Sequence, residues 1–428
     1  MPYIRTIIAN LERNLKAKII IIGNELLYGR IADTNGPWLA KWLDARGIEV
    51  CEIQVLPDER EVLLRAFEDG LKSCDLILTS GGIGPTKDDM TKSLLAEFTG
   101  KKLRPCEETA KIVIENYKYY DREWTPDLNS YHHIPEDFIA TPNPKGLAPG
   151  LVFINNNKLI AAAPGVPREL KAMVEEEFAP YIDKLFKEKY SPKSRIVIRT
   201  ARVPEEKIFK ELCPTLWDEL SQFGLVSSLP QVIGVDIVVT LSGSDPSDEL
   251  VKIKKLIEKS ALNEHVWQWD NTPLPELVIN EARNKKLTFA FAESCTGGLT
   301  ASRITDIPGC SDVFIGSLVT YSNDAKTNIL GVKQQTLKKF GAVSEEVVEE
   351  MACGLLDKIG ADLVLAFSGI AGPTGGSESK PVGTLALASG KKGEIEKSIF
   401  KFAGDRERLK LRFSEIGLFY LLKLIRNY

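Results

Sequence analysis

Histidine is scarce in this sequence: the 428 residues include three, His132, His133 and His265. Residues 266–428 contain none, so a catalytic triad of serine, histidine and aspartate cannot be built from that part of the chain alone. A serine nucleophile there would need another base. Lysine is the alternative, because burial or a nearby cation can lower its pKa enough for the amine to accept a proton.

Long apolar runs and paired cysteines are also missing. Apolar runs such as 19–23 and 363–367 are much shorter than the ~20 residues that cross a bilayer. The seven cysteines include no C-x-x-C pair, which argues against a zinc ribbon and a disulfide framework. The first residues lack the apolar stretch of a secretory signal. We therefore expect a cytoplasmic protein with no membrane partner.

The charge balance is mild. A formal net charge of −4 gives no overall attraction to nucleic acid, so no nucleic-acid partner is expected. The length exceeds the roughly 250 to 300 residues at which single hydrophobic cores stop growing, so several domains are expected.

The order of expected elements indicates an α/β protein. Strands near 18–23, 48–56 and 75–79 alternate with helical stretches at 38–45, 59–71 and 90–98. This alternation is typical of βαβ units, which form a mostly parallel sheet. We predict an N-terminal extension (1–16), a parallel or mixed-sheet α/β domain (17–180), a small α+β connecting domain (181–268) and a C-terminal α/β domain (269–428).

A serine lies between a strand and a helix in the last of these domains. Ser294, in the segment FAESCTGG, follows the strand expected at 287–292 and precedes a helix, whose N-terminal N–H groups favour negative charge. This position suits an acyl-transfer nucleophile with an oxyanion hole. On local sequence alone, a helix N-cap is the more common role for such a serine.

Partners for this serine can be sought along the same domain. Lys326 and Tyr321 follow another strand, although a lysine there could equally be a solvated surface charge. Cys295 is a rival nucleophile, but its thiolate lacks a histidine partner. The loop SGIAGPTGGS could cradle a phosphate or be only a turn, and it lacks the lysine of a P-loop. Arg406 and Arg408 could bind a phosphate or simply face solvent.

A second glycine loop occurs in the first α/β domain. In GGIGPTKDDMT, Asp88 and Asp89 follow the glycines at the start of an expected helix. Two carboxylates there could hold a hard cation such as Mg²⁺ against substrate phosphates. They could equally serve as partners of the helix dipole.

Six segments of the C-terminal domain, in this order, resemble the CinA C-terminal family of nicotinamide-nucleotide amidases over residues 270–428: AESCTGG, PGCSDVF, VTYSNDAK, GAVSEEVVEEMA, SGIAGPTGGSESKPVGT and GDRERLK. The resemblance implies conversion of nicotinamide mononucleotide to nicotinate mononucleotide without a metal. It implies Ser294 as nucleophile and Lys326 as its base, with Tyr321 and Ser311 as supporting polar residues. The implied substrate-binding positions are Thr296, Gly297, Gly298, Asn323, Gly369, Ala371, Gly372, Arg406 and Arg408.

The first domain resembles the N-terminal domain of full-length CinA proteins through GGIGPTKDDMT, GNELLYGRIADTN, NPKGLAPG and PGVPREL. The resemblance implies a fold similar to molybdopterin-cofactor-binding proteins, and cleavage of ADP-ribose to AMP and ribose 5-phosphate with a divalent metal (Mg, Mn or Co). Asn24 stands where the family more often has threonine, and the helix of Nudix pyrophosphatases is absent. The implied nucleotide contacts are Glu25, Asp33, Asn35, Gly81, Gly82, Gly84, Asn143, Gly146, Pro164 and Gly165, with Asp88 and Asp89 at the metal.

Two other interpretations of the whole chain stay open. The first domain could hold a pterin or nucleotide without turning it over. A structural or DNA-uptake role is suggested only by the competence-related name of the family, and the strongly basic surface that it would need is not visible in the composition. The resemblance also implies a homodimer.

Overall fold

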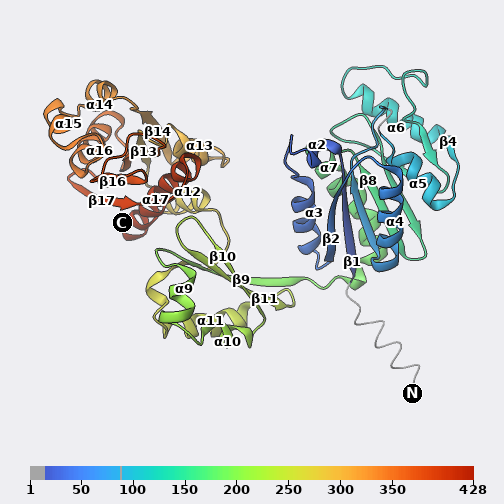
Figure 1. Ribbon diagram of the computed structural model, residues 1–428, viewed down its shortest axis with the longest axis horizontal. Coiled ribbons are helices and arrows are strands. Elements are labelled where there is room, and N and C mark those ends of the chain that lie inside the picture. Colours follow the sequence, from blue (N-terminus) through green and yellow to red (C-terminus); the bar gives the residue numbers. More distant parts are fainter. Residues whose placement is uncertain (1–14, 87–88) are drawn as a thin grey trace. The chain divides into compact units, whose positions relative to one another are not determined.

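A computed structural model describes residues 15–86 and 89–428, so Asp88 and most of the N-terminal extension lie outside the described part. The chain divides into two compact units (Figure 1). Unit 1 comprises residues 1–194 and 240–246, and unit 2 comprises 195–239 and 247–428. Each unit is described by itself. Among the described residues, no helix has both the length and the apolar character needed to cross a bilayer.

Unit 1 is built around a six-stranded sheet in the order β2-β1-β3-β8-β7-β6. Strands β2, β1, β3 and β8 run parallel, whereas β7 and β6 are antiparallel additions at one edge. The α/β fold with a mixed sheet that the sequence predicts is therefore confirmed. Its elements are β1 (Lys16–Ile22), α2 (Asn24–Leu27), α3 (Asn35–Asp44), β2 (Glu49–Leu56), α4 (Arg60–Ser73), β3 (Leu76–Ser80), α5 (Thr91–Thr99), β4 (Leu103–Pro105), α6 (Glu107–Lys118), β5 (His133–Pro135), β6 (Ile139–Thr141), β7 (Gly150–Asn155), β8 (Lys158–Ala163), α7 (Pro167–Met173), a π-helical turn (Val174–Phe178), α8 (Ala179–Phe186) and a 3-10 turn (Lys187–Lys189).

The isoleucine run of β1 shows why this sheet is covered on both faces. Successive side chains of a strand point to opposite faces, so Ile19 and Ile21 pack with α3 and α8, while Ile20 and Ile22 pack with α4 and α5. All four side chains are buried. This interior strand thus packs against two helical layers, and the loops at the carboxyl ends of the parallel strands stay free to form a binding site.

Unit 2 contains two sheets. The sheet in the order β10-β11-β9-β12 is formed from the segment that the sequence assigns to a connecting domain. Its elements are β9 (Lys193–Thr200), α9 (Glu205–Lys207), a π-helical turn (Ile208–Leu212), α10 (Leu216–Ser221), β10 (Leu225–Pro230), β11 (Val235–Ser242), α11 (Ser247–Glu258), a 3-10 turn (Asn263–His265) and β12 (Val266–Gln268), the ends of β9 and β11 being assigned to unit 1.

The second sheet of unit 2 has the order β14-β13-β15-β16-β17, with β14, β13 and β15 parallel and β16 and β17 antiparallel. Helices α12, α13 and α17 pack on one face, and α14 and α16 on the other. Its elements are α12 (Leu274–Lys285), β13 (Phe289–Glu293), α13 (Leu299–Thr305), a 3-10 turn (Cys310–Asp312), β14 (Phe314–Val319), α14 (Asn323–Leu330), α15 (Gln334–Phe340), α16 (Glu345–Ile359), β15 (Leu363–Gly369), β16 (Thr384–Lys391), β17 (Glu394–Lys401) and α17 (Arg406–Asn427).

Helix α17 packs on this sheet through a glycine. A Cβ atom at Gly417 would lie 2.0 Å from Cε1 of the buried Phe367 side chain on β15, so a larger residue would clash with this ring. The same helix begins at Arg406, which it places beside the loops that follow β13, β14 and β15.

Candidate active site

A small cavity opens at the carboxyl ends of β13, β14 and β15, where ligands bind in parallel α/β sheets. Its volume of about 180 Å³ holds a small group such as a carboxamide with part of its ring, and no complete nucleotide. The lining residues are Ser294, Cys295, Tyr321, Asn323, Lys326, Ala342, Val343, Ser368, Gly369, Ala371 and Arg406.

Ser294 and Lys326 form a buried pair in this cavity. The Lys326 Nζ donates to Ser294 Oγ at 2.8 Å, and also to the carbonyl oxygens of Thr320 (2.9 Å) and Tyr321 (3.3 Å). The lysine is 1% exposed and the serine 7%, so the interpretation of Lys326 as a solvated surface charge is wrong. Burial lowers the pKa of Lys326 below its ordinary value, because desolvation penalises the ammonium form.

The geometry suits proton transfer from the serine. A neutral amine has two N–H groups and one lone pair, and the two carbonyl oxygens can accept both N–H groups. The lone pair then faces Ser294 Oγ, so the serine hydroxyl can donate its proton to the amine.

The helix-capping role is not filled by Ser294. Helix α13 begins at Leu299, and the N–H groups of Gly298, Thr300 and Ala301 donate to the carboxylate of Glu293 at 3.0, 3.1 and 2.9 Å. Both the capping interpretation and the expectation that these N–H groups stabilise charge near Ser294 are therefore wrong. The completely buried Glu293 carboxylate already supplies the negative charge that complements the start of the helix.

Glu293 is a site residue that the sequence analysis missed. Its carboxylate also accepts from Ser317 Oγ on β14 (3.1 Å), and its backbone carbonyl accepts from the N–H of Thr320 (2.8 Å). One residue thus joins β13, β14 and α13 directly beside the nucleophile candidate. A carboxylate one residue before the serine and within reach of a helix start was the available signal.

Cys295 also lines the cavity, but its chemistry differs from that of its neighbour. Burial raises the pKa of its thiol to about 12, so the thiolate is a minor species near neutral pH. Within this cavity, Ser294 has the partner that a nucleophile needs and Cys295 does not.

Tyr321 and Arg406 meet at the rim of the cavity. The Arg406 guanidinium donates to Tyr321 Oη (3.1 Å) and to the carbonyl oxygen of Gly372 (2.7 Å). The Tyr321 side chain is 61% exposed, so its ring is open to a ligand that enters from solvent. Asn323, Gly369 and Ala371 line the same cavity, as the sequence analysis expects.

Several expected residues lie outside this cavity. Ser311 is exposed and precedes β14, whereas Ser294 follows β13. Since these two neighbouring strands are parallel, the two serines lie at opposite ends of the strands. Arg408 is also exposed, and its backbone N–H donates to the N-cap Asp405 (2.9 Å). Four more expected substrate-binding residues lie outside the cavity. Thr296 is completely buried, and Gly297 and Gly298 form the turn with φ of 63° and 92°. The carbonyl oxygen of Gly372 accepts a hydrogen bond from Arg406.

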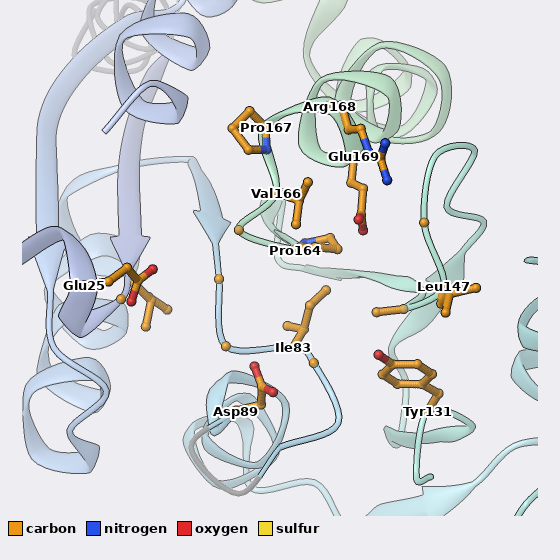
Figure 2. A pocket seen from close by; sticks show the side chains of 18 of the residues that line it. Glu25, Ile83, Asp89, Tyr131, Leu147, Pro164, Val166, Pro167, Arg168 and Glu169 are labelled. Atoms are coloured by element: carbon orange, nitrogen blue, oxygen red, sulfur yellow. The ribbon is translucent and has the colours of Figure 1, made fainter. Parts of the chain in front are cut away.

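A larger cavity of about 730 Å³ lies at the carboxyl ends of the parallel strands in unit 1 (Figure 2). The glycine loop after β3 forms its floor, and a Cβ at Gly81 would lie 2.2 Å from the Ile22 carbonyl oxygen, so glycine is required there. The expected residues that line this cavity are Glu25, Gly81, Gly82, Gly84, Asp89, Gly146, Pro164 and Gly165.

Three residues expected to contact a nucleotide in unit 1 do not line this cavity and instead bond to the loops around it. Asp33 accepts from the N–H groups of Asn35 and Gly36 at the start of α3 (2.9 and 3.0 Å). Asn35 donates to Ser80 Oγ (2.9 Å) and to the Gly165 carbonyl (2.8 Å). Asn143 donates to Glu169 (2.8 Å). These hydrogen bonds hold the three side chains against the loops that surround the cavity.

Carboxylates from separate elements face the unit 1 cavity. Glu25 on α2, Asp89 before α5 and Glu169 on α7 surround the same space (Figure 2), and Asp58 also lines it. Glu169 was missed; burial raises the pKa of its carboxyl. Asp89 accepts from the N–H of Thr86 (2.9 Å). The described residues contain no group of three or more potential metal ligands.

Asn24, where the resembling family more often has threonine, supports the wall of this cavity. Its backbone N–H and its side-chain amide both donate to the Asp58 carboxylate at 3.3 Å. Tyr120, Arg122 and Tyr131, from loops and turns, and Arg168, from the first turn of α7, also line the cavity and were missed, because no local pattern assigns them to it.

Comparisons with known proteins cover both units. The model of the CinA C-terminal domain matches residues 271–425, and that of a probable molybdopterin binding domain matches 18–184. A relative from Caldicellulosiruptor saccharolyticus is 35% identical over 97% of this chain and 100% of its own length. Another, from Clostridium novyi, is 36% identical over 92% and 95%. Both carry the provisional name of competence-damage inducible protein.

Among solved structures, the competence damage-inducible protein A from Klebsiella pneumoniae is 34% identical over 36% of this chain and 96% of its own, with a TM-score of 0.36. The full-length relatives and the two matched domains leave one conclusion: the chain belongs to the CinA family.

Proposed function

We propose that unit 2 is an amidohydrolase that converts nicotinamide mononucleotide and water to nicotinate mononucleotide and ammonia. The observation that carries this proposal is the 2.8 Å hydrogen bond between Lys326 Nζ and Ser294 Oγ in a buried cavity. A serine activated by a neutral lysine is an acyl-transfer nucleophile, and the carboxamide of the substrate is an acyl donor. The family resemblance supplies the identity of the substrate.

In the proposed reaction, Ser294 and Lys326 account for every proton that is transferred. Ser294 Oγ attacks the carboxamide carbon while its proton moves to Lys326 Nζ. The C–N bond then breaks, and the ammonium of Lys326 returns the proton to the departing ammonia. Water hydrolyses the resulting ester, again losing a proton to Lys326, which passes it to Ser294 Oγ. No metal takes part in these steps.

The rim residues suit the rest of this substrate. The cavity of about 180 Å³ accommodates the carboxamide end, so the ribose and phosphate must lie outside its mouth. The pyridinium ring carries a positive charge, which the exposed face of Tyr321 can attract. Arg406, held against Tyr321 by its hydrogen bond, is the cation at this rim that can reach a phosphate.

The pH dependence of ammonia release tests the proposed base. Only the unprotonated amine accepts a proton, so kcat rises with pH through the pKa of Lys326 and is constant above it. Because burial lowers this pKa, we expect the rise below the value of about 10.4 for an ordinary lysine. Ammonia and nicotinate mononucleotide should form in equal amounts at every pH. The exposed-lysine variant Lys338→Ala should keep this profile. A profile that rises only near the ordinary lysine pKa would contradict the assignment.

We further propose that unit 1 hydrolyses ADP-ribose to AMP and ribose 5-phosphate with a divalent cation. The carboxylates fit this role, because Mg²⁺ is usually held by one or two carboxylates together with substrate phosphates and water. Asp89 would hold the cation, with Glu25 and Asp58 on the same cavity, and the cation would neutralise charge on the phosphates. The backbone N–H groups of the loop at Gly82–Gly84 would bind the phosphates.

Metal removal separates the two proposed activities. We expect a chelator to abolish AMP release from ADP-ribose and Mg²⁺, Mn²⁺ or Co²⁺ to restore it, while ammonia release from nicotinamide mononucleotide continues unchanged. Asp89→Asn should lower AMP release by at least about tenfold, because one charged metal ligand is lost. Asp69→Asn, an exposed site on α4, should not. If no metal-dependent AMP release is found, unit 1 is a binding module.

A further inference from the structure

A second cavity in unit 2 lies far from the Ser294–Lys326 pair. Its volume is about 470 Å³, within the range of roughly 300–1,000 Å³ that is typical of small-molecule sites. Residues at the end of β9 and the start of β12 form one side, and the last two turns of α17 form the other.

Helix α17 separates this cavity from the proposed active site. Its first residue, Arg406, lines the active-site cavity, and Lys423 near its end lines the second one. At a rise of 1.5 Å per residue, the two positions are roughly 26 Å apart along the helix axis. A single mononucleotide therefore cannot occupy both cavities.

The second cavity has two cations available to an anion. Arg202 and Lys423 are exposed, and within the described ranges neither side chain has a hydrogen bond or an ion pair. The Nζ of Lys423 lies 5.7 Å from the ring centre of Phe419 and 6.0 Å from that of Tyr420. Arg426 differs, because it is paired with Glu281 (3.1 Å) and donates to the Trp267 carbonyl (2.6 Å), so it holds the wall in place.

Aromatic side chains and a carboxylate complete the lining. Trp267 and Phe419 meet edge to face, with ring centres 5.6 Å apart, and the Arg199 guanidinium lies over the Trp267 ring at 4.4 Å. Phe419 is 4% exposed and holds the half-buried Trp267 ring in place, so Trp267 supplies the apolar surface against which a base can lie. Glu264 lines the same cavity, and a carboxylate is the group that accepts hydrogen bonds from ribose hydroxyls in nucleotide sites.

The backbone of Arg202 is strained in a way that suits a binding role. Its φ is +62°, in the left-handed region that residues other than glycine rarely adopt. The conformation is held by a hydrogen bond from its N–H to the Ile233 carbonyl (2.8 Å). Strained residues of this kind concentrate at functional sites, and here the strain accompanies a guanidinium at the cavity.

We propose that this cavity is a binding site for a nucleoside monophosphate. The base lies against Trp267, the ribose hydroxyls bind Glu264, and the phosphate binds Arg202 and Lys423. The site is separate from both proposed reactions, and neither of them uses these residues.

Equilibrium dialysis of the full-length protein with radiolabelled AMP tests the proposal. We expect Arg202→Ala and Lys423→Ala to weaken one AMP site per chain by at least about tenfold, because charge-assisted hydrogen bonds to phosphate are lost. Asn427→Trp, at an exposed position that lines the cavity, should abolish the same site by filling it. Adenosine, which lacks the phosphate, should bind this site at least about tenfold more weakly than AMP.

The controls separate this site from AMP bound elsewhere. Lys255→Ala removes an exposed lysine of α11 outside the cavity and should leave binding unchanged. AMP bound in unit 1, as a product of the proposed hydrolysis, should persist in all of these variants. The proposal is overturned if the wild type binds no AMP, if the three cavity variants bind it as the wild type does, or if adenosine and AMP bind equally.

Discussion

Replacing Ser294 by alanine should lower the rate of ammonia release from nicotinamide mononucleotide by on the order of 10⁴-fold or more, because the substitution removes the proposed nucleophile. Replacing Lys326 by alanine should lower this rate by about 10²–10⁴-fold, the range for loss of a general base. Steady-state ammonia release, measured with each variant at saturating substrate, gives both numbers.

The controls for this pair distinguish catalysis from folding. Ser302→Ala and Lys338→Ala remove the same side-chain types from exposed positions of unit 2 and should keep the wild-type rate. Lys326→Met fills the buried lysine site with an apolar chain of similar length, so a low rate in this variant cannot be attributed to an empty core position. Circular dichroism should match the wild type throughout. Full activity in Ser294→Ala would refute the serine mechanism.

Replacing Glu293 by glutamine has the second large expected effect. The carboxylate accepts three backbone N–H groups of the turn and first residues of α13 and the hydroxyl of Ser317. Glutamine offers one oxygen and an NH₂ group that would face these donors. Hydrogen bonds to a charged group contribute about 1.5–3 kcal/mol each, so we expect the free energy of unfolding to fall by about 3 kcal/mol or more.

Hydrogen exchange followed by mass spectrometry measures this effect locally, which matters in a chain with two units. Peptides that cover residues 294–305 should exchange faster in Glu293→Gln, and ammonia release should fall as well, because Ser294 follows Glu293 directly. The control is Glu396→Gln, at an exposed position on β17. Unchanged exchange at 294–305 would show that Glu293 does not hold this turn.

The placement of two cationic side chains near the proposed substrate depends on the geometry of one helix. Arg406 and Arg408 both occur in the first turn of α17, yet only Arg406 lines the active-site cavity. Residues two apart on a helix point in different directions, so both cannot face one pocket. The rotation of α17 about its axis therefore decides which of the two arginines faces the cavity.

The sequence by itself determined the architecture of unit 1 and the chemistry to be sought in unit 2. The continuous isoleucine run of β1 and the glycines after β3 are local patterns, because a strand covered on both faces and a left-handed turn both depend on neighbouring residues. Because no histidine occurs after residue 265, a base for Ser294 from that part of the chain would be a lysine, and the Lys326 Nζ lies 2.8 Å from Ser294 Oγ.

Only the tertiary structure decided which groups meet. Glu293, rather than Ser294, accepts hydrogen bonds from the N–H groups at the start of α13. Ser311 lies at the opposite end of the strands from Ser294, because the register of the parallel strands places them so. Burial of Lys326, which lowers its pKa, likewise results from packing by several elements. The second cavity joins the ends of β9 and α17, more than 200 residues apart. No local pattern reports such contacts, since they form only when the chain is folded.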